Sequence, residues 1–412
     1  MADLTKKGGS GSGAVRTSER LELAAMGMEA EFSVTVDGEP TRPEDIFGSP
    51  RAFVRGNMMH RQGTSYHLPT GGAVYFDTGV IEVATPVIEI DRGAAARAGR
   101  SLWESILYLR EELDHWESRT GREIRLTGFS THYNVSFELP MHEQGRNRTV
   151  RKLALLLSYI LPAPVMLLAT NKRSTGVGVR PRGDRIEITA DFTPSASLMI
   201  ATGTLIVGIV REVMTWPTFE LEMLEQMGIP VIAGYKPMKH TSRKGWLARN
   251  DCYPADPFAA DIDDTTWATT DGRELSLRSI AGLIVKHFWH PIRRVSDPWT
   301  FRLIGSVMRG RAPSLLDLDD RPPEYEDVGR LCTWDNLFPE SELSRSRYER
   351  VLIRAISGQK LSMHGRRFTP TGMKGWSAVV FRADDDHSRH VFGIDYLLGH
   401  LQDWERPAAR GG

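Results

Sequence analysis

The sequence predicts an α+β fold, because strand patterns and long helix patterns alternate through the first 215 of its 412 residues. Short segments rich in β-branched and aromatic residues, bounded by glycine, proline or charged residues, are typical of strands. Apolar positions that recur every three or four residues over longer segments are typical of amphipathic helices. The predicted strands are 23–36, 73–76, 80–83, 126–138 and 185–191, and the predicted helices are 92–117, 150–161, 196–215 and 220–227.

The sequence changes character near residue 235, after which charged, Trp-containing and loop-like segments predominate. Helical patterns in this part are confined to 276–288, 340–356 and 392–404. Residues 1–20 contain a Gly/Ser run that is typical of a flexible leader. We therefore predict a leader at 1–20, a main domain at 21–235 and a smaller, loop-rich C-terminal domain at 236–412.

Charge and cysteine content restrict the classes of partner. Basic and acidic residues both number 52, so the formal net charge is zero and no long-range field favours nucleic acid or an anionic membrane. We therefore predict neither as a partner.

Cys252 and Cys332 form no metal-ligand spacing and no disulfide framework, which is typical of a reducing compartment. The first residues lack the apolar core of a signal peptide, and we predict a cytoplasmic protein.

Two apolar stretches are long enough to raise the question of a membrane span. Residues 153–170 are interrupted by Pro162 and Pro164, which disfavours a spanning helix. Residues 196–210 follow a Thr-Pro-Ser sequence, a plausible helix start with proline near the first turn. We predict that both stretches are buried core helices.

Four acidic residues lie on two short strand-like segments. Glu29 and Glu31 occur in G-M-E-A-E-F, and Asp77 and Glu82 in V-Y-F-D-T-G-V-I-E-V-A-T-P. Alternate residues of a strand share a face, so Glu29 and Glu31 project together. A single exposed carboxylate is usually solvated, but buried carboxylates on one face are costly unless a cation neutralises them. Mg²⁺ prefers such oxygen ligands and bridges them to nucleotide phosphates.

Further polar motifs follow on later segments. His132 and Asn134 share a face in T-H-Y-N, where an isolated histidine is more often a hydrogen-bonded core residue. Arg185 and Glu187 share a face in R-I-E-I-T-A-D, which indicates either a structural ion pair or part of a phosphate and metal site. The segment T-G-V-G-V-R near Gly176 lacks the Lys-Ser/Thr of a P-loop, and we predict a loop there.

The order of five of these segments resembles the glutamine-synthetase-like carboxylate–amine ligases. Within that superfamily, the segments are most similar to the ligase and the depupylase that attach and remove the prokaryotic ubiquitin-like protein Pup, and glutamate–cysteine ligases share a looser version. The resemblance covers residues 22–210, and its motifs are G-M-E-A-E-F, L-P-T-G-G-A-V-Y-F-D-T-G-V-I-E-V-A-T-P, T-H-Y-N, N-K-R and R-I-E-I-T-A-D.

The resemblance implies a sheet cradle backed by helices and a role for each matching residue. Asp77 matches the catalytic aspartate, which would act as general base toward an amine in a ligase. Arg173, in the N-K-R segment, and Arg185 match arginines near the ATP phosphates, and Asn134 lies near the nucleotide. The residues implied at the metal site are Glu29, Glu31, Tyr75, Glu82, His132 and Glu187.

This sequence departs from the family pattern at several positions, and these departures bear on which branch of the family it resembles. Glu187 stands where the Pup enzymes have histidine, which is closer to glutamine synthetase and glutamate–cysteine ligase. Thr189 stands where several relatives have a phosphate-facing arginine. The interval from Glu31 to Asp77 lacks the long insertion of the depupylase, which favours a ligase over a hydrolase. The C-terminal half shows no clear match.

We therefore predict an ATP- and Mg²⁺-dependent ligase that joins a carboxylate substrate, a small molecule or a protein tail, to an amine acceptor through an acyl phosphate. Two alternatives remain open at this point: an amide hydrolase on the same scaffold and a degenerate relative that only binds nucleotide. Retention of the full acidic set disfavours the degenerate relative.

Overall fold

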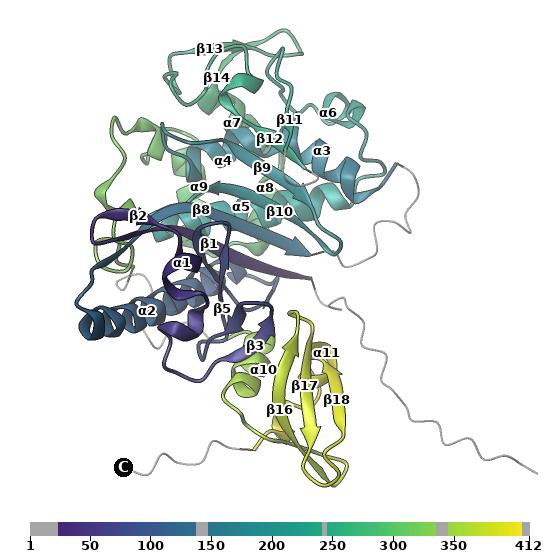
Figure 1. Cartoon of the computed structure of the whole chain (residues 1–412). Helices are drawn as coiled ribbons and strands as arrows, with labels where there is room; N and C mark the ends of the chain where they lie inside the picture. The colour runs from purple at the N-terminus through teal and green to yellow at the C-terminus, as the bar shows by residue number, and fades with distance from the viewer. Residues whose placement is uncertain (1–23, 137–146, 241–244, 335–344, 406–412) are drawn as a thin grey trace, which may run out of the picture.

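Figure 1 shows the computed structural model of the chain, which describes residues 24–136, 147–240, 245–334 and 345–405. The predicted leader at 1–20 lies outside these residues. Buried apolar side chains form two clusters: one draws on residues between 26 and 334, and the other on residues 348–404 together with Ala25 and Met59. The predicted α+β fold class, with a smaller unit at the C-terminal end, is confirmed.

A 12-stranded antiparallel sheet organises the larger unit. Its main path runs β11-β12-β9-β10-β8-β1-β6-β5-β4-β3, and β2 and β7 also pair with β1. All five predicted strands belong to this sheet, close to their predicted bounds. The strands are β1 (Ala25–Val36), β2 (Glu39–Thr41), β3 (Met59–Gln62), β4 (Ser65–His67), β5 (Ala73–Asp77), β6 (Val80–Ala84), β7 (Ile88–Glu89), β8 (Ile124–Ser136), β9 (Val177–Pro181), β10 (Arg185–Asp191), β11 (Met238–Lys239) and β12 (Trp246–Ala248).

Strand β1 shows how the sheet acquires two different faces. Met28, Ala30 and Phe32 are fully buried, whereas the alternating Glu29 and Glu31 are half-buried. Because successive side chains of a strand point to opposite faces, the apolar set packs on the helices and the acidic set lies on the other face. The sequence of β1 therefore determines which side of the sheet carries the polar site.

Helices cover the apolar face of the sheet. Helix α2 (Ala94–Thr120) contacts β1 and β6, and α5 (Ala196–Met214) contacts α2 and β8. The remaining helices of this unit are α1 (Pro43–Phe47), α3 (Val150–Ile160), α4 (Pro162–Ala169), α6 (Glu222–Gln226), α7 (Leu277–His287), α8 (Trp289–Val295) and α9 (Pro298–Val307). Short 3₁₀ turns lie at Pro50–Ala52, Asn250–Cys252, Leu315–Asp317, Pro323–Tyr325 and Leu401–Asp403.

The two apolar stretches are helices of the core, as their sequences predicted. Helix α5 is long and apolar enough to cross a membrane, but 78% of its most apolar window is buried inside the protein. The first stretch forms two helices rather than one, because Pro162 begins α4 after α3 has ended and the pair is bent by 62°. Proline is well accommodated at the first position of a helix, and this explains the break.

The smaller unit contains more regular structure than the sequence predicted. Its four antiparallel strands are β15 (Leu361–Met363), β16 (Arg366–Lys374), β17 (Ala378–Ala383) and β18 (Arg389–Gly393), with helices α10 (Arg347–Ile356) and α11 (Ile394–Leu398). The prediction of a loop-rich region is therefore wrong here. The helix predicted at 392–404 is wrong at its start, because Phe392 lies in β18 and packs against Phe381 and Phe368.

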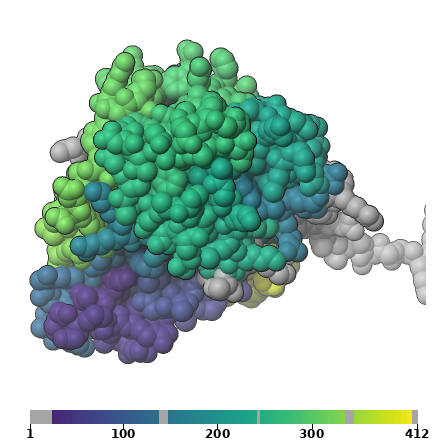
Figure 2. Space-filling view, turned by 90° about the horizontal axis from the view of Figure 1, so that it is seen from above, coloured from purple at the N-terminus to yellow at the C-terminus, as the bar shows by residue number. Residues whose placement is uncertain are grey.

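The smaller unit lies beside β3 of the larger one (Figure 1), and its helix α10 also contacts β7. Arg100 of α2 donates to both carboxylate oxygens of Glu349 in α10, at 2.7 and 2.8 Å, and both side chains are buried. Seen from above in Figure 2, the green segments that follow α5 form most of the visible surface. They include the hairpin of β13 (Thr266–Ala268) and β14 (Glu274–Ser276). The domain boundary predicted near residue 235 stays a prediction.

Candidate active site on the open face of the sheet

Strand register places the polar residues in rows across the open face of the sheet. In the first row, Tyr75 of β5 pairs with Glu82 of β6, Glu82 with Glu31 of β1, and Glu31 with Ser130 of β8. The adjacent row pairs Glu29 with His132, and His132 with Thr189. Residues far apart in the sequence therefore meet because one antiparallel sheet aligns them.

The β5–β6 hairpin fixes Tyr75 opposite Glu82. Its two loop residues, Thr78 and Gly79, have φ values of 56° and 95°. Two-residue hairpin loops favour positive φ at both positions, because that turn matches the twist of the strands. Asp77 closes the hairpin on the face of Tyr75, and it accepts a hydrogen bond from the Thr78 hydroxyl at 2.7 Å.

Four of these side chains form what we call the acidic cluster: Glu29, Glu31, Glu82 and His132. The two ring nitrogens of His132 lie 3.3 Å from a carboxylate oxygen of Glu29 and 3.2 Å from one of Glu31. Ser130 donates to Glu31 at 2.5 Å. Glu29, Glu82 and His132 each offer a ligand atom, and these atoms lie within 4.8 Å of one another.

The electrostatics of the acidic cluster indicate a need for positive charge. Burial, followed by the charges of Glu31 and Glu29, raises the pKa of Glu82 to about 9. Burial would also raise the pKa of Glu29, but the hydrogen bond and charge of His132, with Arg185 and Arg61, lower it to about 2. Burial, then Glu29 and Glu82, raise the pKa of Tyr75, whose hydroxyl hydrogen-bonds to Glu82.

The donor set fits a divalent cation. Three carboxylates and one imidazole, all largely shielded from water, supply hard oxygen ligands and one nitrogen. Mg²⁺ and Mn²⁺ prefer oxygen ligands of this kind, whereas Zn²⁺ is more often bound at sites that contain sulfur ligands. A cation bound there would offset the repulsion that keeps Glu82 protonated.

Glu187 is not brought into this group. Its buried carboxylate forms ion pairs with Arg180 and with Arg182, and Arg182 donates to it at 2.8 and 3.0 Å. Of the two roles left open for Glu187, the structure shows the ion pair, although with these arginines rather than with Arg185. Arg185 instead donates to Asn134 at 2.7 Å and to Asp184 at 2.8 Å.

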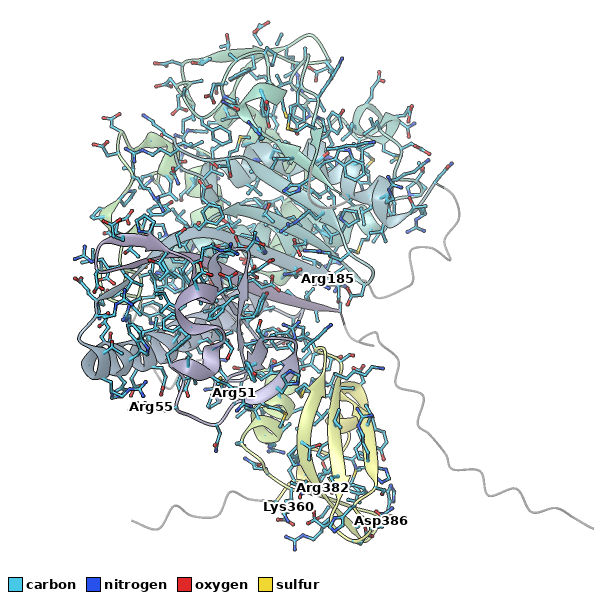
Figure 3. The ribbon with its side chains drawn as sticks, viewed as in Figure 1. Arg51, Arg55, Arg185, Lys360, Arg382 and Asp386 are labelled. Carbon is cyan, nitrogen blue, oxygen red and sulfur yellow. The ribbon has the colours of Figure 1, made fainter. Side chains whose placement is uncertain are left out.

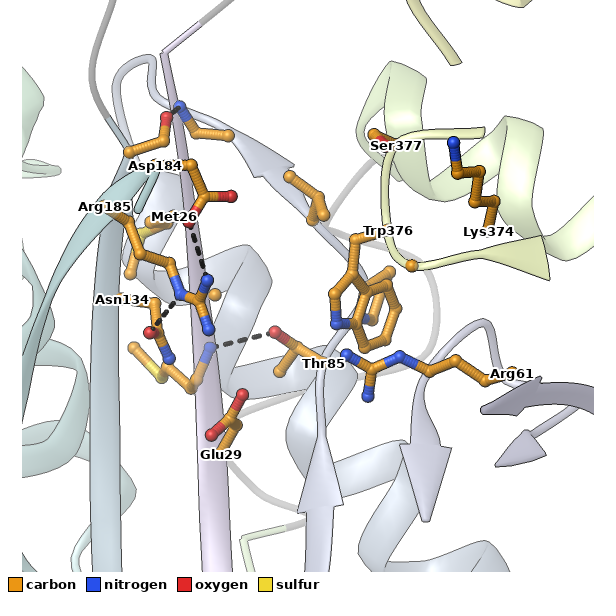
Figure 4. A pocket seen from close by; sticks show the side chains of 17 residues that line it. Met26, Glu29, Arg61, Thr85, Asn134, Asp184, Arg185, Lys374, Trp376 and Ser377 are labelled. Atoms are coloured by element: carbon orange, nitrogen blue, oxygen red, sulfur yellow. Dashed lines mark hydrogen bonds and ion pairs between the residues drawn. The ribbon is translucent and has the colours of Figure 1, made fainter. Parts of the chain in front are cut away.

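The acidic cluster lies between two cavities, and we name the first the Trp376 pocket. It has a volume of about 350 Å³ and lies between β1, β8 and β10 of the large sheet and the β16–β17 turn of the smaller unit. Figure 4 shows Glu29 and Arg185 on one side and Arg61 and Trp376 on the other. Figure 3 shows Arg185 where the larger unit faces the smaller one.

Two cation–π contacts connect the walls of the Trp376 pocket to the acidic cluster. The Arg61 guanidinium lies 4.7 Å from the centre of the Trp376 ring and 5.7 Å from that of Tyr75. Trp376 also packs edge-on against His67, 4.7 Å between ring centres. The smaller unit is therefore part of the site and does not merely adjoin it.

The second cavity, which we name the Arg173 pocket, has a volume of about 370 Å³ and contacts the acidic cluster at Glu31 and His132. Arg173 lines this pocket and Arg185 lines the other, so the structure does not bring the two predicted phosphate-facing arginines together. Asp191 also lines it, and burial raises the pKa of this carboxyl to about 6 although Asn171 and Ser174 donate to it. Arg180, Arg321 and His240 also line this pocket.

Several site residues were missed from the sequence. Ser130 shares the face of His132, so strand alternation could have identified it. Arg180 was missed because the glycine-rich segment that contains it was predicted as a loop, whereas it is strand β9. A Cβ on Gly178 would lie 2.2 Å from the Thr189 hydroxyl, so this glycine permits close strand packing. Arg61 and Trp376 carried no local signal.

Comparisons with known proteins find similarity at the level of structure only. No protein-family model matches the chain, and no curated protein matches it. A search of solved structures finds the complex between the prokaryotic ubiquitin-like protein Pup and its ligase PafA, with 12% identity over 93% of each chain and a TM-score of 0.49. It also finds the Pup ligase PafA in complex with ADP, with 11% identity over 88% of this chain and 94% of that one, and a TM-score of 0.41.

These structures belong to the group that the sequence motifs resemble. At this level of identity and TM-score, they assign neither a family nor an activity to the chain. The function proposed below therefore depends on the geometry of the site.

Proposed function

We propose that the protein is an ATP- and Mg²⁺-dependent carboxylate–amine ligase that forms an amide through an acyl phosphate. The observation that carries this proposal is the position of the acidic cluster between two pockets that both present cationic groups. A ligase of this kind must bring a nucleotide and a carboxylate to one metal site from two directions. The open face of the sheet provides that arrangement.

The Trp376 pocket is the better candidate for the nucleotide. Trp376 offers a flat aromatic surface for a base, and stacking of this kind is sequence-tolerant and worth about 1–3 kcal/mol. Arg185 and Lys374 supply cationic groups for phosphates. Glu29 lines the same pocket, so a bound phosphate chain would end near the acidic cluster.

The Arg173 pocket is then left for the carboxylate substrate. Arg173 and Arg321 line it, and guanidinium groups match carboxylates in a bidentate geometry. Glu31 and His132 form its boundary with the acidic cluster, where the carboxylate would accept the transferred phosphoryl group. The substrate can be a small molecule or the tail of a protein, and the amine acceptor approaches the same face.

In the proposed reaction, the cation would neutralise charge on the transferring phosphoryl group, and Glu29, Glu31, Glu82 and His132 would hold it. Attack on the acyl phosphate requires an unprotonated amine. Asp77 lies on the open face two positions beyond Tyr75, and we assign to it the role of general base. Arg173 and Arg185 would orient the substrate carboxylate and the nucleotide phosphates, respectively.

The test measures ADP release with Mg-ATP and a panel of carboxylates and amines, in the wild type and in D77N. We expect ADP to form in proportion to amide, and D77N to abolish amide formation while changing nucleotide affinity less than twofold. The control is D386N, because Asp386 lies in a distant hairpin of the smaller unit (Figure 3). Wild-type rates in D77N would refute the role of Asp77, and cleavage of an amide without ADP release would identify the hydrolase instead.

A further inference from the structure

A third cavity lies away from the acidic cluster, at the junction of the two units. We name it the α10 pocket; it has a volume of about 360 Å³ and shares no lining residue with the other two cavities. Four segments converge on it: the start of the described chain, the β7–α2 connection, the last turn of α5 and the start of α10. Its lining contains five arginines, which are Arg97, Arg211, Arg345, Arg347 and Arg350.

The carboxylates around the α10 pocket neutralise only part of this charge. Glu89 and Asp91 are the acidic residues in its lining. Asp91 forms an ion pair with Arg97, and Glu89 lies 3.3 Å from the Nε atom of Arg347. Glu89 also accepts a hydrogen bond from the backbone of Tyr348 at 3.2 Å.

Arg345 and Arg350 differ in their pairing. Arg345 lies 3.0 Å from Glu104 and 2.7 Å from Glu349, neither of which lines the pocket. Arg350 is exposed and has no ion-pair partner among the residues that the structure describes. The five arginines of the pocket therefore face four carboxylates, those of Glu89, Asp91, Glu104 and Glu349, and Glu349 is shared with Arg100, so positive charge is in excess.

Two of these arginines lie close together at the start of α10. Arg347 and Arg350 are three positions apart in the first turns of the helix, so they share one face. Like charges at this spacing repel each other, and a cation near a helix N-terminus also opposes the helix dipole. Both effects destabilise the helix alone, and an anion bound between these side chains would reverse them.

We propose that the α10 pocket binds a ligand that carries two or more linked phosphoryl groups. The planar guanidinium fork matches phosphate oxygens in a bidentate way, and the exposed Arg347 and Arg350 lie on one face of α10, where a chain of phosphoryl groups could reach both. The cavity volume lies within the range of small-molecule sites. Because α10 belongs to the smaller unit and the other walls to the larger one, the bound ligand would hold the two units together.

The experiment titrates the full-length protein with inorganic tripolyphosphate and, separately, with ADP by calorimetry, in EDTA so that the acidic cluster holds no metal. The test variant is R347Q/R350Q. The matched control is R293Q/R294Q, which also removes two exposed arginines, from α8. Circular dichroism spectra that match that of the wild type, with one cooperative melting transition, establish that both variants are folded.

We expect tripolyphosphate to bind the wild type and the control equally, and to bind R347Q/R350Q at least tenfold more weakly. ADP is then expected to retain a component that W376A does not remove, because the Trp376 pocket does not account for it. Absence of tripolyphosphate binding to the wild type, or an equal loss in both double variants, would overturn the proposal. ADP binding that W376A abolishes, without any tripolyphosphate binding, would overturn it as well.

Discussion

Replacing Glu82 with glutamine should stabilise the metal-free protein and weaken its response to metal. The pKa of Glu82 is about 9 in the folded state, against an ordinary value of 4.5. Between these pH values the folded protein retains a proton that the unfolded chain has lost. The free energy of unfolding therefore falls as pH rises through this window.

The size of the effect follows from the pH interval. Neutral pH lies about 2.5 pH units above the ordinary pKa, and each unit is worth 1.36 kcal/mol, so Glu82 costs about 3 kcal/mol at pH 7. Glutamine has nearly the same shape and no charge to lose. With an unfolding entropy of roughly 2.1 cal/mol/K per residue, E82Q should melt about 4 °C higher than the wild type in EDTA at pH 7.

The assay compares melting temperatures at pH 5, 7 and 8.5, in EDTA and in excess Mg²⁺. The difference between E82Q and wild type in EDTA should shrink to under about 1 kcal/mol at pH 5, because that pH lies only about half a unit above the ordinary pKa of 4.5. Mg²⁺ should stabilise the wild type more than E82Q, since the variant lacks a ligand. The control is E39Q, an exposed glutamate on β2. An E82Q protein that is less stable than wild type at pH 7 in EDTA would refute the reasoning.

Three further changes test other parts of the structure. W376A should weaken nucleotide binding about tenfold, because a stacking surface is lost; W299A, at the exposed Trp299 of α9, serves as the control, and equal losses would contradict the assignment. Burial, then Arg61, lower the pKa of His67 to about 3, so the folded state cannot take up the proton that the unfolded chain gains below pH 6.5. Wild type should therefore lose about 2 kcal/mol between pH 6.5 and pH 5, and H67N should lose less; identical pH profiles in melting experiments would contradict this. E349Q should destabilise the docked smaller unit by about 1.5–3 kcal/mol, because the buried Arg100 loses the carboxylate that accepts two of its hydrogen bonds while its contact with Glu104 remains, and proteolysis of that unit should become faster; unchanged proteolysis would show that other contacts hold it.

Much of the acidic cluster could be predicted from local pattern. Period-two alternation put Glu29 with Glu31, and the motif order then added Glu82 and His132. These predictions were possible because strand alternation depends only on neighbouring residues. In the structure, pairing between the strands places these residues side by side on one face of the sheet.

Features that depend on long-range contact were not predictable in this way. The pairing of Glu187 with Arg180 and Arg182 depends on the β9–β10 register. Strand β9 was not predicted, because its glycine-rich sequence is typical of a loop. The Trp376 pocket requires the smaller unit to dock about 300 residues away in sequence from β1. The four-stranded sheet of that unit also escaped prediction, and its longest strand, β16, is interrupted by Pro370 and Gly372, two residue types that disfavour a strand prediction.

The contribution of Trp376 to the first pocket has a consequence for biosynthesis. The residues of the acidic cluster lie between positions 29 and 132, so they are synthesised early. Trp376 and Lys374, which form one wall of the pocket, are synthesised almost 250 residues later. During translation the large sheet can therefore form while the Trp376 pocket still lacks one side. If the Trp376 pocket binds nucleotide as proposed, nucleotide would stabilise chains that extend through the smaller unit and not chains that end before it.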